Sequence, residues 1–187
     1  MPKHFIKKIS TSLVFAVAMT VSTTASEIMV DDFRSNPAQK WRFFADTVMG
    51  GKSSGQVVFK NEGEAAYARM TGRVTTANNG GFIQIRKELS SSPPEGTKGV
   101  KLMVRGNGER YFVHLRTSGT LLPWQYYQAS FSTTGSWREV RLPLERFTRS
   151  GSFLRQTPTP TSLKSVGIVA FGREHKADIE VREVGFY

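Results

Sequence analysis

The side chains best suited to bind a ligand occupy the polar positions of segments, here called runs, in which polar and apolar residues alternate. An arginine guanidinium donates several hydrogen bonds in one plane to an oxygen-rich ligand, and an aromatic ring can stack on a flat one. If the runs form neighbouring strands, these positions share one polar sheet surface. The alternative interpretation is the solvated outer face that an antiparallel sandwich has in any case. The candidate ligand-binding residues are Gln84, Arg86, His114, Arg116, Trp124, Tyr126 and Gln128.

A loop with two consecutive glycines supplies a second set of candidates. The glycines allow a tight backbone path, and Asp46 and Ser53 can fix it with side-chain-to-backbone hydrogen bonds. In the structural interpretation, Met49 also plugs the end of the core. In the functional interpretation, the loop forms one wall of a pocket beside Arg86 and Trp124. The candidate wall residues are Asp46, Met49, Gly50, Gly51 and Asn79, the last also being typical of a simple turn.

No constellation of residues indicates an enzyme. The chain has no cysteine, which excludes thiolate metal sites and a cysteine nucleophile. Its three histidines have no further ligands at zinc spacing, and the chain lacks a G-x-S-x-G nucleophile motif. Most acidic residues sit at the ends of the alternating runs and in turns, where exposure to water accounts for an acidic residue without any catalytic role. We therefore expect a non-catalytic protein.

Residues 1–26 have the character of a targeting segment. A basic start precedes an apolar run at 13–21 (LVFAVAMTV), and small residues follow at 22–26. This order is typical of a secretory signal peptide, with a mitochondrial transit peptide as the alternative, and the run is too short to span a bilayer. We expect cleavage near residue 26 and a periplasmic or secreted protein without a membrane span.

The rest of the chain, residues 27–187, is long enough for one ordinary domain. The 187-residue sequence has 26 Lys+Arg and 15 Asp+Glu, which gives a formal net charge of +11. This excess favours partners with acidic surfaces. Because the basic residues are scattered and a secreted protein rarely meets nucleic acid, we expect no nucleic-acid partner.

Period-two alternation recurs through this domain and predicts strands joined by turns. About nine or ten strands, with no long helix, indicate an all-β fold, a jelly-roll β-sandwich. The turn Gly106-Asn107-Gly108 predicts a hairpin between its flanking runs. A short helix is expected at 144–147 and a long surface loop at 149–164. The predicted strands cover 56–60, 65–71, 81–86, 99–105, 109–117, 125–133, 137–142, 166–171 and 179–187.

The apolar positions of the same runs are the predicted core. Each of these residues alternates with a polar neighbour, so that one face of each strand is apolar. They are Ile83, Ile85, Val100, Leu102, Val104, Tyr111, Val113, Leu115, Tyr127, Ala129 and Phe131.

A structural calcium ion is a minor option at the meeting point of the first and last strands. Calcium prefers several oxygen ligands, some of them carboxylates, although no EF-hand spacing is present. The ordinary interpretation is that these acids are exposed at strand ends. The weak calcium candidates are Asp31, Asp32, Asp178 and Glu180, and otherwise we expect no metal or cofactor.

An ordered set of short motifs carries a family resemblance over about residues 31–187. The set comprises Asp46-x-x-Met49-Gly50-Gly51-x-Ser53, Asn79-Gly80-Gly81-Phe82 through Arg86, Gly106-x-Gly108 with Tyr111, Trp124 through Tyr127-x-Ala129-x-Phe131, and Trp137 leading to Leu142-Pro143-Leu144-x-x-Phe147. No single motif is specific, but the ordered set resembles the complex I intermediate-associated protein 30 family.

This resemblance implies a galactose-binding-like jelly roll, similar in architecture to carbohydrate-binding modules. The mitochondrial members are assembly factors for respiratory complex I and carry no catalytic residues to transfer. The apparent secretion signal departs from those members, because a periplasmic protein does not reach the matrix or cytoplasmic side of complex I. Two functions follow as expectations for a bacterial cell envelope: a protein-interaction or assembly module, and, as the alternative, a carbohydrate-binding module that uses the polar aromatic surface.

Overall fold

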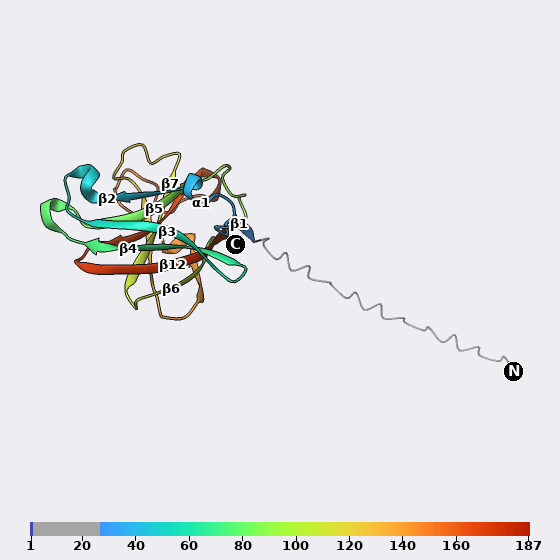
Figure 1. Ribbon diagram of the computed structural model, residues 1–187. Helices are drawn as coiled ribbons and strands as arrows, with labels where there is room; N and C mark the ends of the chain where they lie inside the picture. The colour runs from blue at the N-terminus through green and yellow to red at the C-terminus, as the bar shows by residue number, and fades with distance from the viewer. Residues whose placement is uncertain (2–26) are drawn as a thin grey trace.

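Two antiparallel sheets pack face to face in the computed structural model, which describes residue 1 and residues 27–187. The rest of the predicted signal peptide lies outside the described residues. Sheet A contains β1 (Ile28–Asp31), β3 (Ser54–Glu62), β4 (Ala65–Val74), β6 (Gly99–Gly106), β9 (Arg138–Pro143) and β12 (His175–Phe186). Its order is β3-β4-β12-β6-β9, and β3, β4, β12 and β6 follow one another from top to bottom in Figure 1.

Sheet B contains β2 (Trp41–Ala45), β5 (Phe82–Glu88), β7 (Arg110–Thr117), β8 (Tyr127–Ser132), β10 (Thr148–Arg149) and β11 (Leu163–Phe171). Its order is β10-β8-β7-β11-β5-β2, which places β11 between β7 and β5. Helical structure in the described part is short: α1 (Pro37–Lys40) and 3₁₀ turns at Asp46–Met49, Ala77–Asn79, Leu144–Arg146 and Pro160–Ser162. The expected all-β jelly-roll sandwich is thus confirmed.

The core lies between the sheets and consists of the predicted apolar rows. All eleven predicted core residues are buried, with exposed fractions of 6% or less. The centre of sheet B adds Leu163, Val166, Ile168 and Ala170 from β11, each fully buried. Burial of these rows fixes which face of each strand points outward, because a slip of one residue would expose every apolar side chain.

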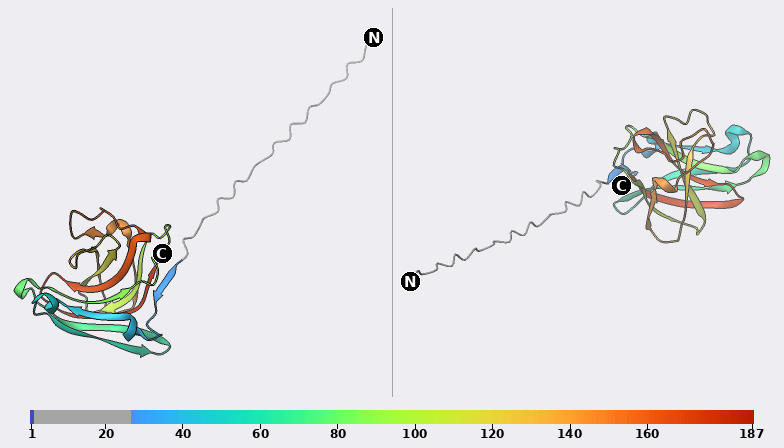
Figure 2. Two further views of the ribbon diagram at one scale, coloured as in Figure 1. Left: turned by 90° about the horizontal axis from the view of Figure 1, so that it is seen from above. Right: turned by 180° about the vertical axis from the view of Figure 1, so that it is seen from behind.

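The described chain has twelve strands rather than nine or ten. The additional ones are β1, β2 and β10, and their sequences explain why alternation does not reveal them. In β2 (WRFFA), Phe44 on the outer face is as apolar as Phe43 on the inner one. In β10 there are only two residues. β1 pairs with the end of β12, so the C-terminus lies beside the start of the domain in both views of Figure 2.

The hairpin predicted at Gly106-Asn107-Gly108 is wrong. β6 pairs with β12 and β9 in sheet A, whereas β7 pairs with β11 and β8 in sheet B. The turn is real, with Gly108 at φ +85°, but it carries the chain from one sheet to the other. Tyr111 and Asn107 fix it: the Tyr111 hydroxyl donates to Asn107 Oδ1 at 2.7 Å. Both strands bury one face in the same core, so the polar alternation alone does not say whether they are paired.

Within the described residues, no helix has the length and apolar character needed to cross a membrane.

Candidate functional site

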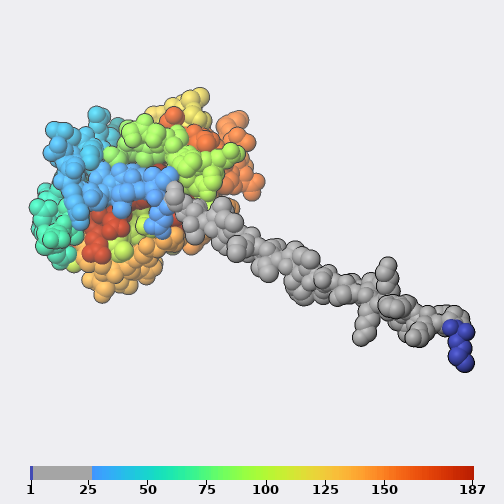
Figure 3. Space-filling model, turned by 90° about the vertical axis from the view of Figure 1, so that its right-hand side faces the viewer, coloured from blue at the N-terminus to red at the C-terminus, as the bar shows by residue number. Residues whose placement is uncertain are grey.

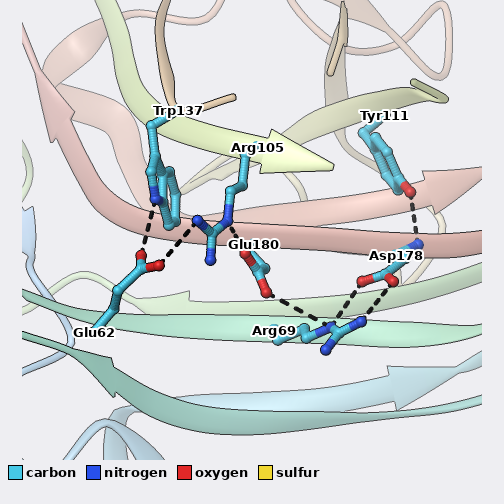
Figure 4. A network of polar contacts seen from close by, with 7 residues as sticks. All are labelled: Glu62, Arg69, Arg105, Tyr111, Trp137, Asp178 and Glu180. Carbon is cyan, nitrogen blue, oxygen red and sulfur yellow. Dashed lines mark hydrogen bonds and ion pairs between the residues drawn. The ribbon is translucent and has the colours of Figure 1, made fainter. Parts of the chain in front are cut away.

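The outer face of sheet A is a network of paired charges. Arg69 donates to both carboxylate oxygens of Asp178, at 2.9 and 2.7 Å. Arg105 bonds Glu180 and, at 3.2 Å, Glu62. Figure 4 shows these side chains reaching toward one another across β3, β4, β6 and β12. Arg69 and Arg105 each have their own acid here, so these two charges need no ligand to balance them.

The outer face of sheet B carries most of the predicted binding residues. Strand register aligns Arg42, Arg86, Gly167, His114 and Gln128 in one row across β2, β5, β11, β7 and β8. The structure therefore brings together the predicted candidates of three separate runs, as expected if those runs share a sheet. Gly167 lies at the middle of the row, and the Gln84 side chain lies close above it, since a Cβ added at Gly167 would lie 3.2 Å from Gln84 Oε1. We call this surface, including Gln84, Phe112 and Arg116 of the adjacent rows, the B face.

An aromatic cluster covers one half of the B face. His114 and Tyr126 stack with ring centroids 4.1 Å apart and an interplanar angle of 8°. Phe171 packs edge-on against both rings, and Phe112 packs against Phe171. Together they bury Val169, which lies on the outer side of the sheet and is fully inaccessible. Phe112 and Phe171 are absent from the sequence candidates, yet each was visible as an apolar residue at a position where alternation predicts a polar one.

Three buried polar atoms on the B face have no hydrogen-bond partner among the described residues. They are His114 Nε2, Gln128 Oε1 and Ser165 Oγ. Burial lowers the pKa of His114 to about 3, and the Gln128 side chain, which lies opposite the imidazole without hydrogen-bond geometry, raises it by a smaller amount. His114 is therefore neutral at physiological pH. A buried polar group without a partner costs free energy that a ligand or a water molecule can recover.

The burial of His114 predicts that the stability of the protein depends on pH. This dependence should be smaller in the variant His114→Phe. The unfolded histidine titrates near pH 6.5, whereas the folded one stays neutral, so the unfolded state takes up more protons as pH falls. We expect the wild-type free energy of unfolding to fall by about 2 kcal/mol more than that of the variant between pH 7 and pH 5. Urea unfolding at the two pH values measures this difference. Equal losses in both proteins would contradict a buried neutral His114.

Beside the cluster lies a hollow of about 250 Å³, here called the Arg86 hollow. Arg86 Nε lies 3.3 Å from Glu88 Oε1, and its guanidinium lies over the Phe44 ring at 4.7 Å. Ser165 is almost fully buried and sits between Glu88 and Arg116 in the strand register. The residues that line the hollow are Arg86, Glu88, Arg116, Thr117, Thr120, Lys164 and Ser165.

Arg116 has a positioning role that sequence reasoning missed. Its guanidinium donates to the carbonyl oxygens of Thr120, Leu122 and Pro123 at 2.9, 3.0 and 3.3 Å. These bonds shape the loop between β7 and β8. Arg116 therefore closes one side of the Arg86 hollow with a side chain that is already largely engaged.

Trp124 lies apart from the residues of the B face. It is 62% exposed on the β7–β8 loop, which meets the loop after β10 through Ser150. Arg149 binds the carbonyls of Ser152 and Leu154, and Phe153 between them is 98% exposed. We call Leu121, Leu122, Trp124 and Phe153 the apolar tip. The two loops, yellow and orange in Figure 3, lie together at one edge of the domain.

Asp46 organises the double-glycine loop from a fully buried position. Its carboxylate accepts hydrogen bonds from Ser53 N and Oγ at 2.9 and 2.5 Å, and from Gly81 N and Phe82 N at 2.5 and 3.3 Å. Burial opposes ionisation, but the hydrogen bonds outweigh it and hold the pKa of Asp46 below its usual value. The contacts support the structural interpretation of this loop.

The loop lies at the other end of β5 from the Arg86 hollow. It bonds Phe82 at the start of the strand, and Arg86 lies four residues on, about 13 Å along an extended strand. The double-glycine loop is therefore not a wall beside Arg86. Met49 is 59% exposed and does not plug the core. Gly50 and Asn79 both have positive φ, at 86° and 58°, as tight turns require.

The calcium candidates are not brought together. Asp31 pairs with Val184 near the end of β12, whereas Asp178 and Glu180 lie beside β4 and bind Arg69 and Arg105. Asp32 accepts a hydrogen bond from the backbone of Arg34. Over the described part of the chain, no group of three or more His, Cys, Asp or Glu is arranged to hold a metal ion. Arginine and backbone N–H groups occupy the carboxylates instead.

A comparison with family models identifies the evolutionary origin of this domain. The model described as complex I intermediate-associated protein 30 (CIA30) matches residues 31–181, from the end of β1 into β12. The chain belongs to the CIA30 family. The match includes the whole B face and the Asp46 loop of this CIA30 domain. No curated protein matches the chain.

Solved structures that superpose on this domain include carbohydrate-binding modules. A family 11 module from Clostridium thermocellum, in complex with a β-1,3-1,4-mixed-linked tetrasaccharide, superposes with a TM-score of 0.71 at 13% identity, covering 88% of this chain and 96% of that one. The family 30 module of the cellulosomal cellulase Cel9D-Cel44B of C. thermocellum gives 0.59 at 9% identity, covering 87% and 98%. At these identities the likeness shows the fold alone, the β-sandwich of the CIA30 domain.

Proposed function

We propose that this CIA30-family domain is a non-catalytic binding module that holds a glycan on the B face. The observation that carries the proposal is the contrast between the two outer faces. On sheet A, Arg69 and Arg105 pair with acids and one outer-face polar atom, Arg182 Nε, is buried without a partner in the described chain, whereas sheet B gathers three such atoms with a stacked aromatic pair and a hollow. Aromatic rings that take the flat face of a sugar, beside polar groups that take its hydroxyls, are the usual composition of a polar ligand site.

A sugar ring over Gly167 would take the place of the Gln84 side chain there and lie between the aromatic pair and Arg86. His114 Nε2 and Gln128 Oε1 would each gain a hydrogen bond there, as donor or acceptor according to the histidine tautomer. The neighbouring carbohydrate-binding modules support a glycan over other polar ligands, since they share the sandwich architecture. Nothing in this scheme requires bond breaking, in keeping with a binding role.

Loss of the half-buried Tyr126 ring should weaken glycan binding. We expect Tyr126→Ala to reduce affinity at least tenfold in affinity electrophoresis through soluble polysaccharides, because the variant loses the ring that stacks on His114. Tyr126→Phe keeps the ring and should retain most binding, which separates stacking from misfolding. The matched control is Phe153→Ala, whose side chain is 98% exposed on the apolar tip. Unchanged binding by folded Tyr126→Ala would refute the proposed site.

A second candidate is a protein-interaction or assembly role, favoured by the family match and by the apolar tip. Leu121, Leu122, Trp124 and Phe153 expose large apolar surface on two loops that arginines hold in place. Exposed apolar patches of this kind mark contacts with other molecules. If the protein has this second role, a protein partner should cross-link to the wild type and to Tyr126→Ala in cell envelopes, but not to Phe153→Ala.

We further propose that the protein acts in the periplasm or outside the cell, after removal of residues 1–26. The basic, apolar and small-residue order of that segment supports export. Expression of the full chain and mass determination of the exported product would test it. A product that keeps residues 1–26 would contradict cleavage.

A further inference from the structure

The Arg86 hollow has an uncompensated positive charge. Three basic residues line it, Arg86, Arg116 and Lys164, against the single acid Glu88. The ion pair between Glu88 and Arg86 also contributes little, because the Glu88 side chain is 69% exposed to water. On sheet A, Arg69 and Arg105 have shorter contacts than this, to the less exposed acids Asp178 and Glu180.

A second hollow of about 320 Å³ continues the same charge toward β2. It shares Arg86 and Glu88 with the first and adds Arg42, which is exposed and lies opposite Arg86 in the register. The two lysines of this hollow, Lys40 and Lys87, have their own acid, since both lie within 3.7 Å of the buried Asp31 carboxylate. The surplus charge is therefore that of the arginines and Lys164.

Burial makes this surplus costly to the free protein. Arg116 is partly buried, and both that burial and the nearby charge of Arg86 lower its pKa. Two guanidinium groups that repel one another beside a low-dielectric sheet surface are stabilised by any anion placed between them. The Arg116 carbonyl contacts shape a loop but bring no negative charge.

Ser165 provides a second, independent sign of a ligand. Its hydroxyl lines the Arg86 hollow, is 99% buried as a residue and has no hydrogen-bond partner in the described chain. A hydroxyl at the floor of a hollow can donate one hydrogen bond to an anion that the arginines attract. Positive charge, a hydroxyl donor without a partner in the described chain and an open hollow thus coincide at one point of the B face.

We propose that the Arg86 hollow binds the anionic group of an acidic glycan, such as the carboxylate of a uronic acid. This inference rests on the proposed function, because it assigns the chemical class of the glycan. Arg86 would supply the charge and the planar donors, and Ser165 would supply the hydroxyl donor. The attached sugar ring would extend over Gly167 toward the stacked His114 and Tyr126. A neutral glycan would leave the repulsion between the arginines unrelieved.

Two forms of one polymer test the charge requirement. Isothermal titration would compare polygalacturonate with its fully methyl-esterified form, which keeps the sugar backbone but masks the carboxylates. We expect the purified protein to bind the acidic form at least tenfold more tightly. We expect Arg86→Gln to lose at least tenfold in affinity for that form, and Arg86→Lys to recover part of the loss. The single variant Ser165→Ala should also weaken binding of the acidic form, although it leaves the net charge unchanged.

The matched control is Arg73→Gln, an exposed arginine on the outer face of sheet A. It removes the same charge, so an equal loss in Arg73→Gln would show general attraction to a basic protein and overturn the inference. Equal binding of acidic and esterified polymer would overturn it and leave the glycan function standing. If no polymer binds, but monomeric galacturonate still raises the melting temperature of wild type and not of Arg86→Gln, the anion site stands and the glycan function falls. No effect of any of these ligands would overturn both.

Discussion

Asp46→Ala is expected to lower the free energy of unfolding by about 4 kcal/mol, since it removes the acceptor of several buried donors at once. Three backbone N–H groups, those of Ser53, Gly81 and Phe82, lose their partner, while the Ser53 hydroxyl keeps the Thr75 carbonyl as an acceptor. Each buried N–H left without a partner costs about 1–3 kcal/mol, and water entering the gap recovers some of that sum. Urea unfolding at pH 7 would measure the loss.

The control for this variant is Asp32→Ala, an acid with one backbone hydrogen bond at an exposed turn. It should cost less than about 1 kcal/mol. Because the pKa of Asp46 is lowered on folding, its ionised form contributes stability above the unfolded pKa, and that contribution is lost as pH falls through the folded pKa. The difference between wild type and Asp46→Ala should therefore shrink in acid. A difference that is small at pH 7, or that grows in acid, would contradict this assignment.

The same carboxylate explains both glycines that flank it in space. A Cβ added at Gly51 would lie 2.3 Å from Asp46 Cγ, and one at Gly80 would lie 2.4 Å from Asp46 Oδ2. Two glycines far apart in sequence thus make room for one buried acid. The sequence-based interpretation assigned Gly51 only a tight path, because spacing along the chain does not reveal what approaches a glycine from another strand.

The inner and outer faces of the strands could be read from the sequence because alternation records burial directly. Ile83 and Ile85 are buried while Gln84 and Arg86 share the B face, as predicted. The grouping of three runs on one surface also held, since β5, β7 and β8 all belong to sheet B. Alternation does not contain the identity of the neighbouring strand, and this is why the sequence predicts a hairpin at 106–108 where the structure has a turn between the sheets.

The finer make-up of the site depends on contacts that no local pattern contains. Arg116 and Arg86 are alike in sequence, yet Arg116 bonds three loop carbonyls while Arg86 has only Glu88. Trp124 precedes the B-face residue Tyr126 by two positions, but the loop turns it toward the apolar tip. Nothing in the sequence around Ser165 marks it as a site residue. It lines the Arg86 hollow because β11 lies between β5 and β7. These distinctions arise from tertiary packing, which decides where each side chain of a shared face finds a partner.

Phe131→Ala is expected to lower the free energy of unfolding by about 3–5 kcal/mol, the usual cost of emptying a buried phenylalanine site. Phe131 is only 6% exposed, and its ring lies 6.3 Å from that of Tyr111 on the adjacent strand. Ser130→Ala is the matched control, because Ser130 lies opposite Phe112 on the outer side of the same strand and should change stability by less than about 1 kcal/mol.

The pair of variants tests the orientation of β8 and, through it, the composition of the B face. If β8 were shifted by one residue, Ser130 would point inward and Phe131 outward, and Gln128 would leave the row that it shares with His114. The costs of the two substitutions would then exchange. Since the proposed ligand contacts of Gln128 and Tyr126 depend on this register, a small loss for Phe131→Ala in urea unfolding would remove the physical basis of the site as well as that of the core.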